Sequence, residues 1–264
     1  MVSFAAKFHA PSRLATWPLI LLPAAVAIVW RGIVAAQEAM AGFLVDDAYI
    51  SLRHARHFVD GHGFTYNAGE RIEGYTNFLW TALAAIPHAL GTEVEAFMQA
   101  LGIASAVGLV AALAVLAKRY GGWLAAVAMA ATLACDDRLI GFAVWGLEIT
   151  FYPMLCAWAL VALVAGRPVL SGLVFGLAAM TRMEALLLVA AAGLFLLARE
   201  RFNGGQVSRA AGWREWLGML APASKFSISF LSVFGTYFIA RWTYYSYLLP
   251  NTFYAKVGSP KDSL

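Results

Sequence analysis

Residues 96–117, AFMQALGIASAVGLVAALAVLA, carry no charged side chain and are long enough to cross a bilayer as one helix, which takes about 20 apolar residues. Of the 264 residues, 61% are hydrophobic and 13% are charged, whereas a soluble domain is about 25% charged. A water-soluble globule of this size could not hide so much apolar surface. The composition therefore predicts an all-α polytopic membrane protein. Further apolar stretches cover 14–36, 78–91, 122–135, 147–165, 168–181, 183–199 and 225–248.

The basic residues indicate which stretches cross the membrane, because cytoplasmic loops carry an excess of Lys and Arg. If 78–91 crossed, Lys118 and Arg119 would lie on the side opposite to Lys7 and Arg13. If 78–91 instead lies along the outer interface, most of the basic residues share the side of the N-terminus. The second layout is favoured. It has about seven crossings, with the N-terminus cytoplasmic and the C-terminus outside.

This layout defines a first outer loop at about 37–95 and a cytoplasmic loop at about 199–224. The stretch 14–36 is interpreted as an uncleaved first helix, and Trp213–Leu220 as an amphipathic segment in the interface. All acidic residues except Glu200 and Glu215 then lie outside or near the outer ends of helices. An acid-rich outer face indicates chemistry there, or else acids simply fill the outer loops. The basic residues form no sustained run, so nucleic acid is not an expected partner.

Two adjacent carboxylates, Asp46 and Asp47, follow the first membrane helix. Such a pair is costly near a membrane unless it is solvated, paired or bound to a metal. A carboxylate is suited to act as a general base, taking the proton from an attacking hydroxyl. The alternative is that one Asp caps a helix starting near Ala48, with Arg53 and Arg56 pairing across a turn. The sequence leaves both interpretations open.

A phosphate leaving group would need cations at the outer face. Arg182 lies between two apolar runs at the predicted outer rim, which makes it a functional-site candidate, and its alternative role is a salt bridge with Glu184. Glu148, at the start of another crossing, is expected to face the same cavity, or else to make a structural hydrogen bond. The cations expected on the outer side are Arg53, Arg56, Arg71, Arg138, Arg182, Arg241 and Lys256.

The histidines and the C-terminal aromatics each allow a structural and a functional interpretation. Three histidines near the aspartates match no tight ligand spacing, so surface histidines are favoured and no metal site is assigned, although a divalent cation stays open. The aromatic-rich tail 241–256 is typical of an interfacial aromatic belt. Aromatic rings also stack on sugars, and Asn251 and Lys256 offer donors to hydroxyls or phosphate. The histidines are His54, His57 and His62.

Several of these segments together resemble a known family. The runs 46–53, 61–63 and 69–77 resemble the first periplasmic loop of a bacterial GT-C glycosyltransferase family that includes the mycobacterial terminal arabinofuranosyltransferase of cell-wall arabinan. Other segments resemble further motifs of that family, in order along most of the chain. They are Gly146-Leu147-Glu148 (Gly-Met-Glu-Thr in the family), Thr181-Arg182-Met183-Glu184-Ala185 (Thr-Arg-Pro-Glu-Gly) and the post-helix signature at 249–256.

The resemblance implies a GT-C module over 1–264, with juxtamembrane helices in the first outer loop and the active site on the outer face of a bacterial inner membrane. It implies inverting transfer of a sugar from a polyprenyl-phosphate donor to an envelope glycan, lipid or protein. Asp46 or Asp47 would be the base, and Glu73 would orient the acceptor. The candidate substrate-binding residues are Arg53, Arg71, Tyr75, Asn77, Glu148, Arg182, Glu184, Asn251 and Lys256, with Arg182 and Lys256 contacting phosphate.

The chain departs from the family pattern at Ile149, Met183 and Ala185. Family members generally continue with further helices and often a periplasmic domain, which this chain is expected to lack. A truncated, non-catalytic scaffold or lipid-binding subunit is therefore an alternative function. A lipid or solute transporter is another, but paired repeats with broken helices are not seen.

Overall fold

The computed structural model describes residues 17–38, 44–203, 213–251 and 254, and these ranges contain helices and no strand. The predicted all-α fold is confirmed. The helices are α1 (Trp17–Glu38), α2 (Asp46–Val59), α3 (Phe78–Leu90), α4 (Val94–Ala134), α5 (Asp137–Val144), α6 (Phe151–Val164), α7 (Pro168–Thr181), α8 (Ala185–Asn203), α9 (Trp213–Phe230), a π-helical segment (Leu231–Gly235) and α10 (Thr236–Tyr245).

Two helical stretches are long and apolar enough to cross a membrane, namely Val94–Ala134 and the continuous helix Ala221–Tyr245. The other apolar helices are shorter. The segment Trp213–Leu220 forms the first turns of α9 and continues directly into the second of these stretches. Its position in the membrane interface stays a prediction. The structure thus supports a membrane location by the length and composition of these two helices.

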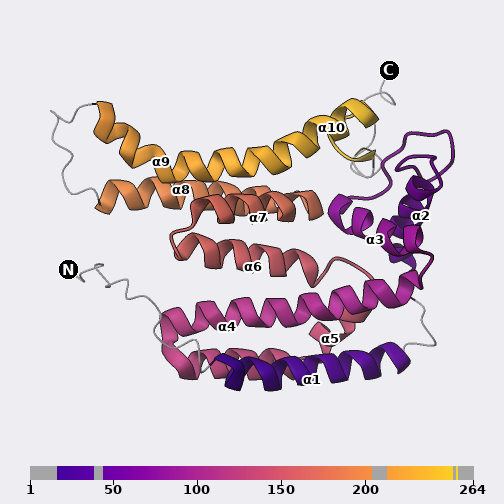
Figure 1. The fold of residues 1–264 in the computed structure, drawn as a ribbon, viewed down its shortest axis with the longest axis horizontal. Helices are drawn as coiled ribbons and strands as arrows, with labels where there is room; N and C mark the ends of the chain where they lie inside the picture. The colour runs from indigo at the N-terminus through magenta and orange to yellow at the C-terminus, as the bar shows by residue number, and fades with distance from the viewer. Residues whose placement is uncertain (1–16, 39–43, 204–212, 252–253, 255–264) are drawn as a thin grey trace.

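Helix α4 consists of two arms that meet at Gly122. This residue has φ 73° and ψ −167°, a backbone conformation that only glycine adopts readily. The chain turns back there (Figure 1), and Ala126 and Ala130 of the second arm share a buried apolar cluster with Ile28 of α1. The two arms correspond to the predicted apolar stretches 96–117 and 122–135.

Most of the long helices lie side by side with alternating direction (Figure 1). Helix α4 packs on α1 and on α6, α6 packs on α7, and α7 packs on α9, which also contacts α8. Helices α2 and α3 pack on each other at one end of this array, which we call the α2–α3 end (Figure 1). The turn between α6 and α7 lies at the opposite end.

The buried residues form two apolar clusters, one around α1, α4 and α5 and the other around α2, α3 and α6 to α9. Large apolar side chains nevertheless stay exposed on the flanks of the array. Monomeric soluble proteins rarely expose extended apolar surface of this kind. Flanks of this type suit contact with lipid. Among the most exposed are Leu22, Leu124, Leu187, Leu194, Ile228 and Ile239, which are between 61% and 82% exposed.

Two glycines of α7 allow the backbone of α9 to approach closely. A Cβ atom at Gly172 would collide with the Phe226 carbonyl oxygen and the Ser229 hydroxyl, and one at Gly176 would lie 2.7 Å from Val233 Cβ. Val233 belongs to the π-helical segment. Small residues at this four-residue spacing are a common means of close helix packing in membranes.

We expect Gly172→Leu to lower the thermal unfolding midpoint of the detergent-solubilised protein, because the new side chain meets backbone atoms that cannot move aside. Overpacking of this kind costs about 1–3 kcal/mol. Gly193→Leu, on exposed α8 with nothing within 4 Å of a Cβ atom, is the matched control. Equal midpoints for the two variants would contradict the close α7–α9 contact.

Candidate functional site

The segment 73–77 carries three of the predicted site residues into the protein interior. Glu73, Tyr75 and Asn77 are 1%, 4% and 6% exposed, whereas Thr76 between them is exposed. Side chains of an extended chain alternate between its two faces, so every second residue points inward. This short segment between α2 and α3 therefore supplies one inward row of polar groups.

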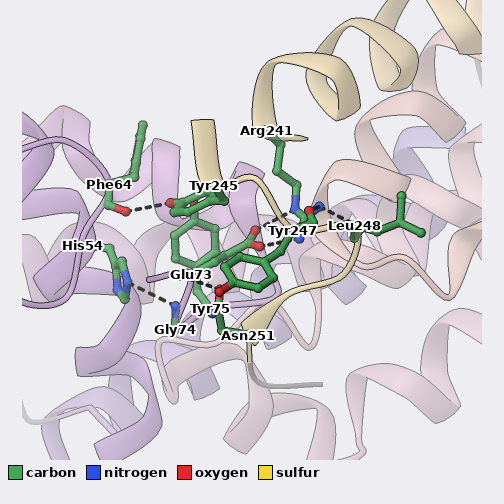
Figure 2. Close-up of polar contacts among 10 residues, drawn as sticks. All are labelled: His54, Phe64, Glu73, Gly74, Tyr75, Arg241, Tyr245, Tyr247, Leu248 and Asn251. Atoms are coloured by element: carbon green, nitrogen blue, oxygen red, sulfur yellow. Dashed lines mark hydrogen bonds and ion pairs between the residues drawn. The ribbon is translucent and has the colours of Figure 1, made fainter. Parts of the chain in front are cut away.

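Glu73 forms a buried ion pair with Arg241 of α10 (Figure 2). Arg241 Nε and Nη2 donate to the two carboxylate oxygens at 2.9 and 2.5 Å. Arg241 Nη1 also donates to the carbonyl oxygens of Tyr247 and Leu248, at 3.2 and 3.0 Å. The Glu73 backbone N–H donates to Asn251 Oδ1 at 3.2 Å. The first loop is thus joined to the last helix and to the residues that follow it.

This pair is almost completely removed from water, since the two side chains are 2% and 3% exposed. Burial raises the pKa of the Glu73 carboxyl, and hydrogen bonding and attraction from Arg241 oppose that shift. Both carboxylate oxygens face the guanidinium. The expectation that Glu73 orients an acceptor stays a prediction, and what the geometry provides directly is an anchor for the loop.

The tyrosines at the end of α10 pack against the first loop. Tyr245 Oη donates to the Phe64 carbonyl oxygen at 2.6 Å and lies 3.1 Å from Tyr75 Oη. Tyr244 lies against Gly63, where a Cβ atom would collide with its hydroxyl. These two rings thus contact the first loop, and the aromatic belt predicted for the tail stays a prediction. Arg71 is exposed, and its guanidinium lies 5.0 Å from the centre of the Tyr244 ring.

His54 is fully buried, so the expectation of a surface histidine is wrong at this position. Its Nδ1 lies 2.8 Å from the Ile50 carbonyl oxygen, which can only accept, so Nδ1 carries the proton. Its Nε2 is then free to accept from the Gly74 N–H at 3.4 Å (Figure 2). Burial lowers the pKa of His54, which favours this neutral form. The imidazole thereby helps to hold the 73–77 segment on α2.

A second polar network joins four of the predicted residues. Asn77 Nδ2 donates to Glu148 Oε2 at 2.6 Å, and Arg182 Nη1 donates to Glu148 Oε1 at 2.6 Å. Arg182 Nη2 also donates to Glu184 at 3.2 Å, as the salt-bridge alternative proposed. Ser51 of α2 and Thr81 of α3 also donate to Asn77 Oδ1, at 3.0 and 3.1 Å. Glu148 is 5% exposed and Arg182 is 37% exposed, so the network reaches from the interior to the surface.

Asp46 and Asp47 are exposed in the first turn of α2. The helix begins at Asp46 with Val45 as its N-cap, and no side chain makes a cap hydrogen bond. The interpretation that an aspartate caps a helix starting near Ala48 is therefore wrong. Arg53 and Arg56 do not pair with these two aspartates either. Arg53 Nε donates to the Tyr66 carbonyl oxygen at 2.7 Å, and Arg56 pairs with Asp60 at 3.6 Å.

Comparison with protein-family models, with curated proteins and with solved structures found no match. The resemblance to the GT-C family therefore rests on the sequence motifs alone. Within the described ranges no three His, Cys, Asp or Glu side chains gather as metal ligands, and a divalent cation stays a prediction. Lys256 lies outside the described residues.

The sequence did not single out Arg241 as the partner of Glu73, because 168 positions separate them. The one available signal was a lone arginine inside a predicted membrane stretch, which indicates a partner without identifying it. The sequence carried no signal for the contact between Asn77 and Glu148 either, since 71 positions separate them. Glu148 and Arg182 were expected to face the same cavity, and their direct ion pair agrees with that expectation.

We expect Arg241→Ala to destabilise the protein strongly, because it leaves the Glu73 carboxylate buried without its counter-ion. Breaking a buried pair on one side costs about 3–5 kcal/mol. Arg56→Ala removes a matched but exposed pair, which is worth about 1 kcal/mol or less. The check is the thermal unfolding midpoint of both variants in detergent. Similar midpoints would show that the Glu73–Arg241 pair does not anchor the loop.

Proposed function

We propose that this chain is an inverting membrane glycosyltransferase of the GT-C type, which transfers a sugar from a polyprenyl-phosphate donor to an envelope acceptor. One observation carries the proposal. The segments that resemble the family lie far apart in the sequence, yet they meet at the α2–α3 end. Asn77, Glu148 and Arg182 form one network, and Glu73 contacts Asn251. Convergence of this kind is expected of a functional site and not of unrelated motif matches.

The arrangement of the helices supports a seven-crossing layout. The crossings would be α1, the two arms of α4, α6, α7, α8, and α9 with α10, while α2 and α3 stay at the outer face. Basic residues gather at the opposite end, with Lys118 and Arg119 just before the Gly122 turn and Arg167 between α6 and α7. A cytoplasmic position for that end satisfies the positive-inside rule. The active site would then face outward.

In the proposed reaction an acceptor hydroxyl attacks the anomeric carbon from the face opposite the phosphate. The new bond from carbon to acceptor oxygen forms as the bond from carbon to phosphate oxygen breaks, so the configuration inverts. Polyprenyl phosphate leaves with the bonding electron pair. Asp46 or Asp47 takes the hydroxyl proton, which exposed carboxylates in the first turn of a fixed helix are placed to do.

The leaving phosphate would be met by cations at the same end. Arg182 reaches the surface there, but Glu148 and Glu184 already pair with it. Its proposed phosphate contact therefore competes with two carboxylates. Arg53 and Arg71 are exposed at this end and have no carboxylate among their described partners, so they are available to bind substrate.

Transfer of radiolabelled sugar from polyprenyl-phosphate donors tests the function, in membranes that express the chain at matched levels. We expect Asp46→Asn or Asp47→Asn to lower transfer by about 100-fold or more, the usual contribution of a general base. Asp60→Asn, at the other end of the same helix and also exposed, should leave it unchanged. Absence of transfer from native protein across the tested donors, or full activity in both variants, would refute the proposal.

Cysteine accessibility tests the membrane layout separately. In a Cys135→Ser background we expect Thr92→Cys, after α3, to react with a membrane-impermeant maleimide in intact cells. Arg167→Cys, between α6 and α7, should react only after permeabilisation. Both side chains are exposed, so access depends on the side of the membrane alone. The reverse pattern would mean that α3 crosses the bilayer.

A further inference from the structure

A shallow depression of about 290 Å³ lies between α2 and the loop that follows it. Two apolar surfaces border it, the Tyr66 ring and Ile72, which are 40% and 44% exposed. Two planar polar side chains, Asn67 and Glu70, complete the rim. The full lining is Ile50, Tyr66, Asn67, Glu70, Ile72 and Gly74. The side chains of these six residues take no part in the Glu73–Arg241 pair or in the Asn77–Glu148–Arg182 network.

The rim is held in place before any ligand binds. Arg53 donates to the Tyr66 carbonyl oxygen, and its guanidinium lies 4.6 Å from the centre of the Tyr66 ring. One residue earlier in the chain, the Thr65 carbonyl oxygen lies 2.9 Å from His57 Nδ1 of α2. Asn67 Nδ2 donates to Glu70 Oε2 at 3.2 Å. An exposed ring and a polar pair fixed in this way lose little conformational entropy on binding.

The depression lies next to the proposed base. Ile50, which forms one wall, follows Asp46 by four residues and Asp47 by three, and residues at these spacings are neighbours on a helix surface. Side chains on a helix also lean toward its N-terminus, so Ile50 leans toward the aspartates. A group that contacts Ile50 in the depression is therefore about one helical turn from the carboxylates.

We infer that this depression binds a sugar unit of the acceptor, which makes the acceptor a glycan. This inference rests on the proposed function. A partly exposed aromatic ring beside planar carboxylate and amide groups matches the chemistry of a sugar ring, which has C–H faces and a rim of hydroxyls. The Tyr66 ring stacks on the C–H face, while Glu70 and Asn67 bind the hydroxyls. The neighbouring hydroxyl is then presented to Asp46 or Asp47.

The location of the depression favours binding of the acceptor and not of the donor. Apart from Ile50, the lining residues all belong to the loop 66–74, most of whose residues are exposed. A polyprenyl-phosphate donor is held in the bilayer by its lipid chain, so its sugar must arrive from the membrane side. A water-soluble glycan chain can reach the depression directly.

The kinetic test compares Tyr66→Ala and Glu70→Gln with Tyr120→Ala, an exposed tyrosine at the opposite end of the array. Transfer of labelled sugar to neutral trisaccharides of hexopyranose or pentofuranose units is measured in membranes. Loss of one stacked ring or one hydroxyl contact should raise the acceptor KM about tenfold. The donor KM and kcat should change little, and Tyr120→Ala should match native protein. An unchanged acceptor KM, or an effect on donor KM alone, overturns the inference.

A binding measurement separates this inference from the proposed function. Saturation-transfer NMR detects the same trisaccharides on purified protein in detergent, without any donor. We expect a signal with native protein and Tyr120→Ala that is lost in Tyr66→Ala. Sugar binding lost with Tyr66→Ala in a protein that transfers nothing would uphold the site and refute the transferase. No signal with native protein, or one that survives Tyr66→Ala, overturns the site even if transfer is observed.

Discussion

The ion pair between Glu73 and Arg241 is the constraint on which the α2–α3 end depends. Taking two charges out of water is costly, and only close pairing with further hydrogen bonds offsets that cost. Here both carboxylate oxygens meet the guanidinium, whose remaining N–H groups bind the carbonyl oxygens of Tyr247 and Leu248. A loop near the start of the chain is thereby fixed to its last helix. The inward row of Glu73, Tyr75 and Asn77 follows from that attachment.

The packing of α7 on α9 fixes the position of the helix that continues into α10 and carries Arg241. Gly172 and Gly176 remove the side chains that would hold the two helices apart, and the π-helical segment lies against the second glycine. A π turn inserts an extra residue and so changes the rotation of the helix that follows it. Apolar packing between α7 and α9 thus determines where the Arg241 side chain lies at the α2–α3 end.

The two buried networks support a surface that stays open. Asp46, Asp47 and the Tyr66 depression are exposed, yet α2 beneath them is held by His54, by Ser51 and by the 73–77 segment. Sites that act on a substrate need reactive groups that water and ligands can reach, on elements that do not move. A rigid interior with an exposed acidic rim satisfies both requirements.

The sequence by itself determined the helical fold, since the apolar stretches coincide with helices and Gly122 separates two of them. It also identified Asp46, Glu73 and Asn77 as members of one polar loop. It could not assign partners, because an ion pair between positions 73 and 241 leaves no periodic or local pattern. The tertiary structure decided which polar groups are buried and which are exposed. Burial depends on how distant helices pack, and that packing is a property of the whole chain.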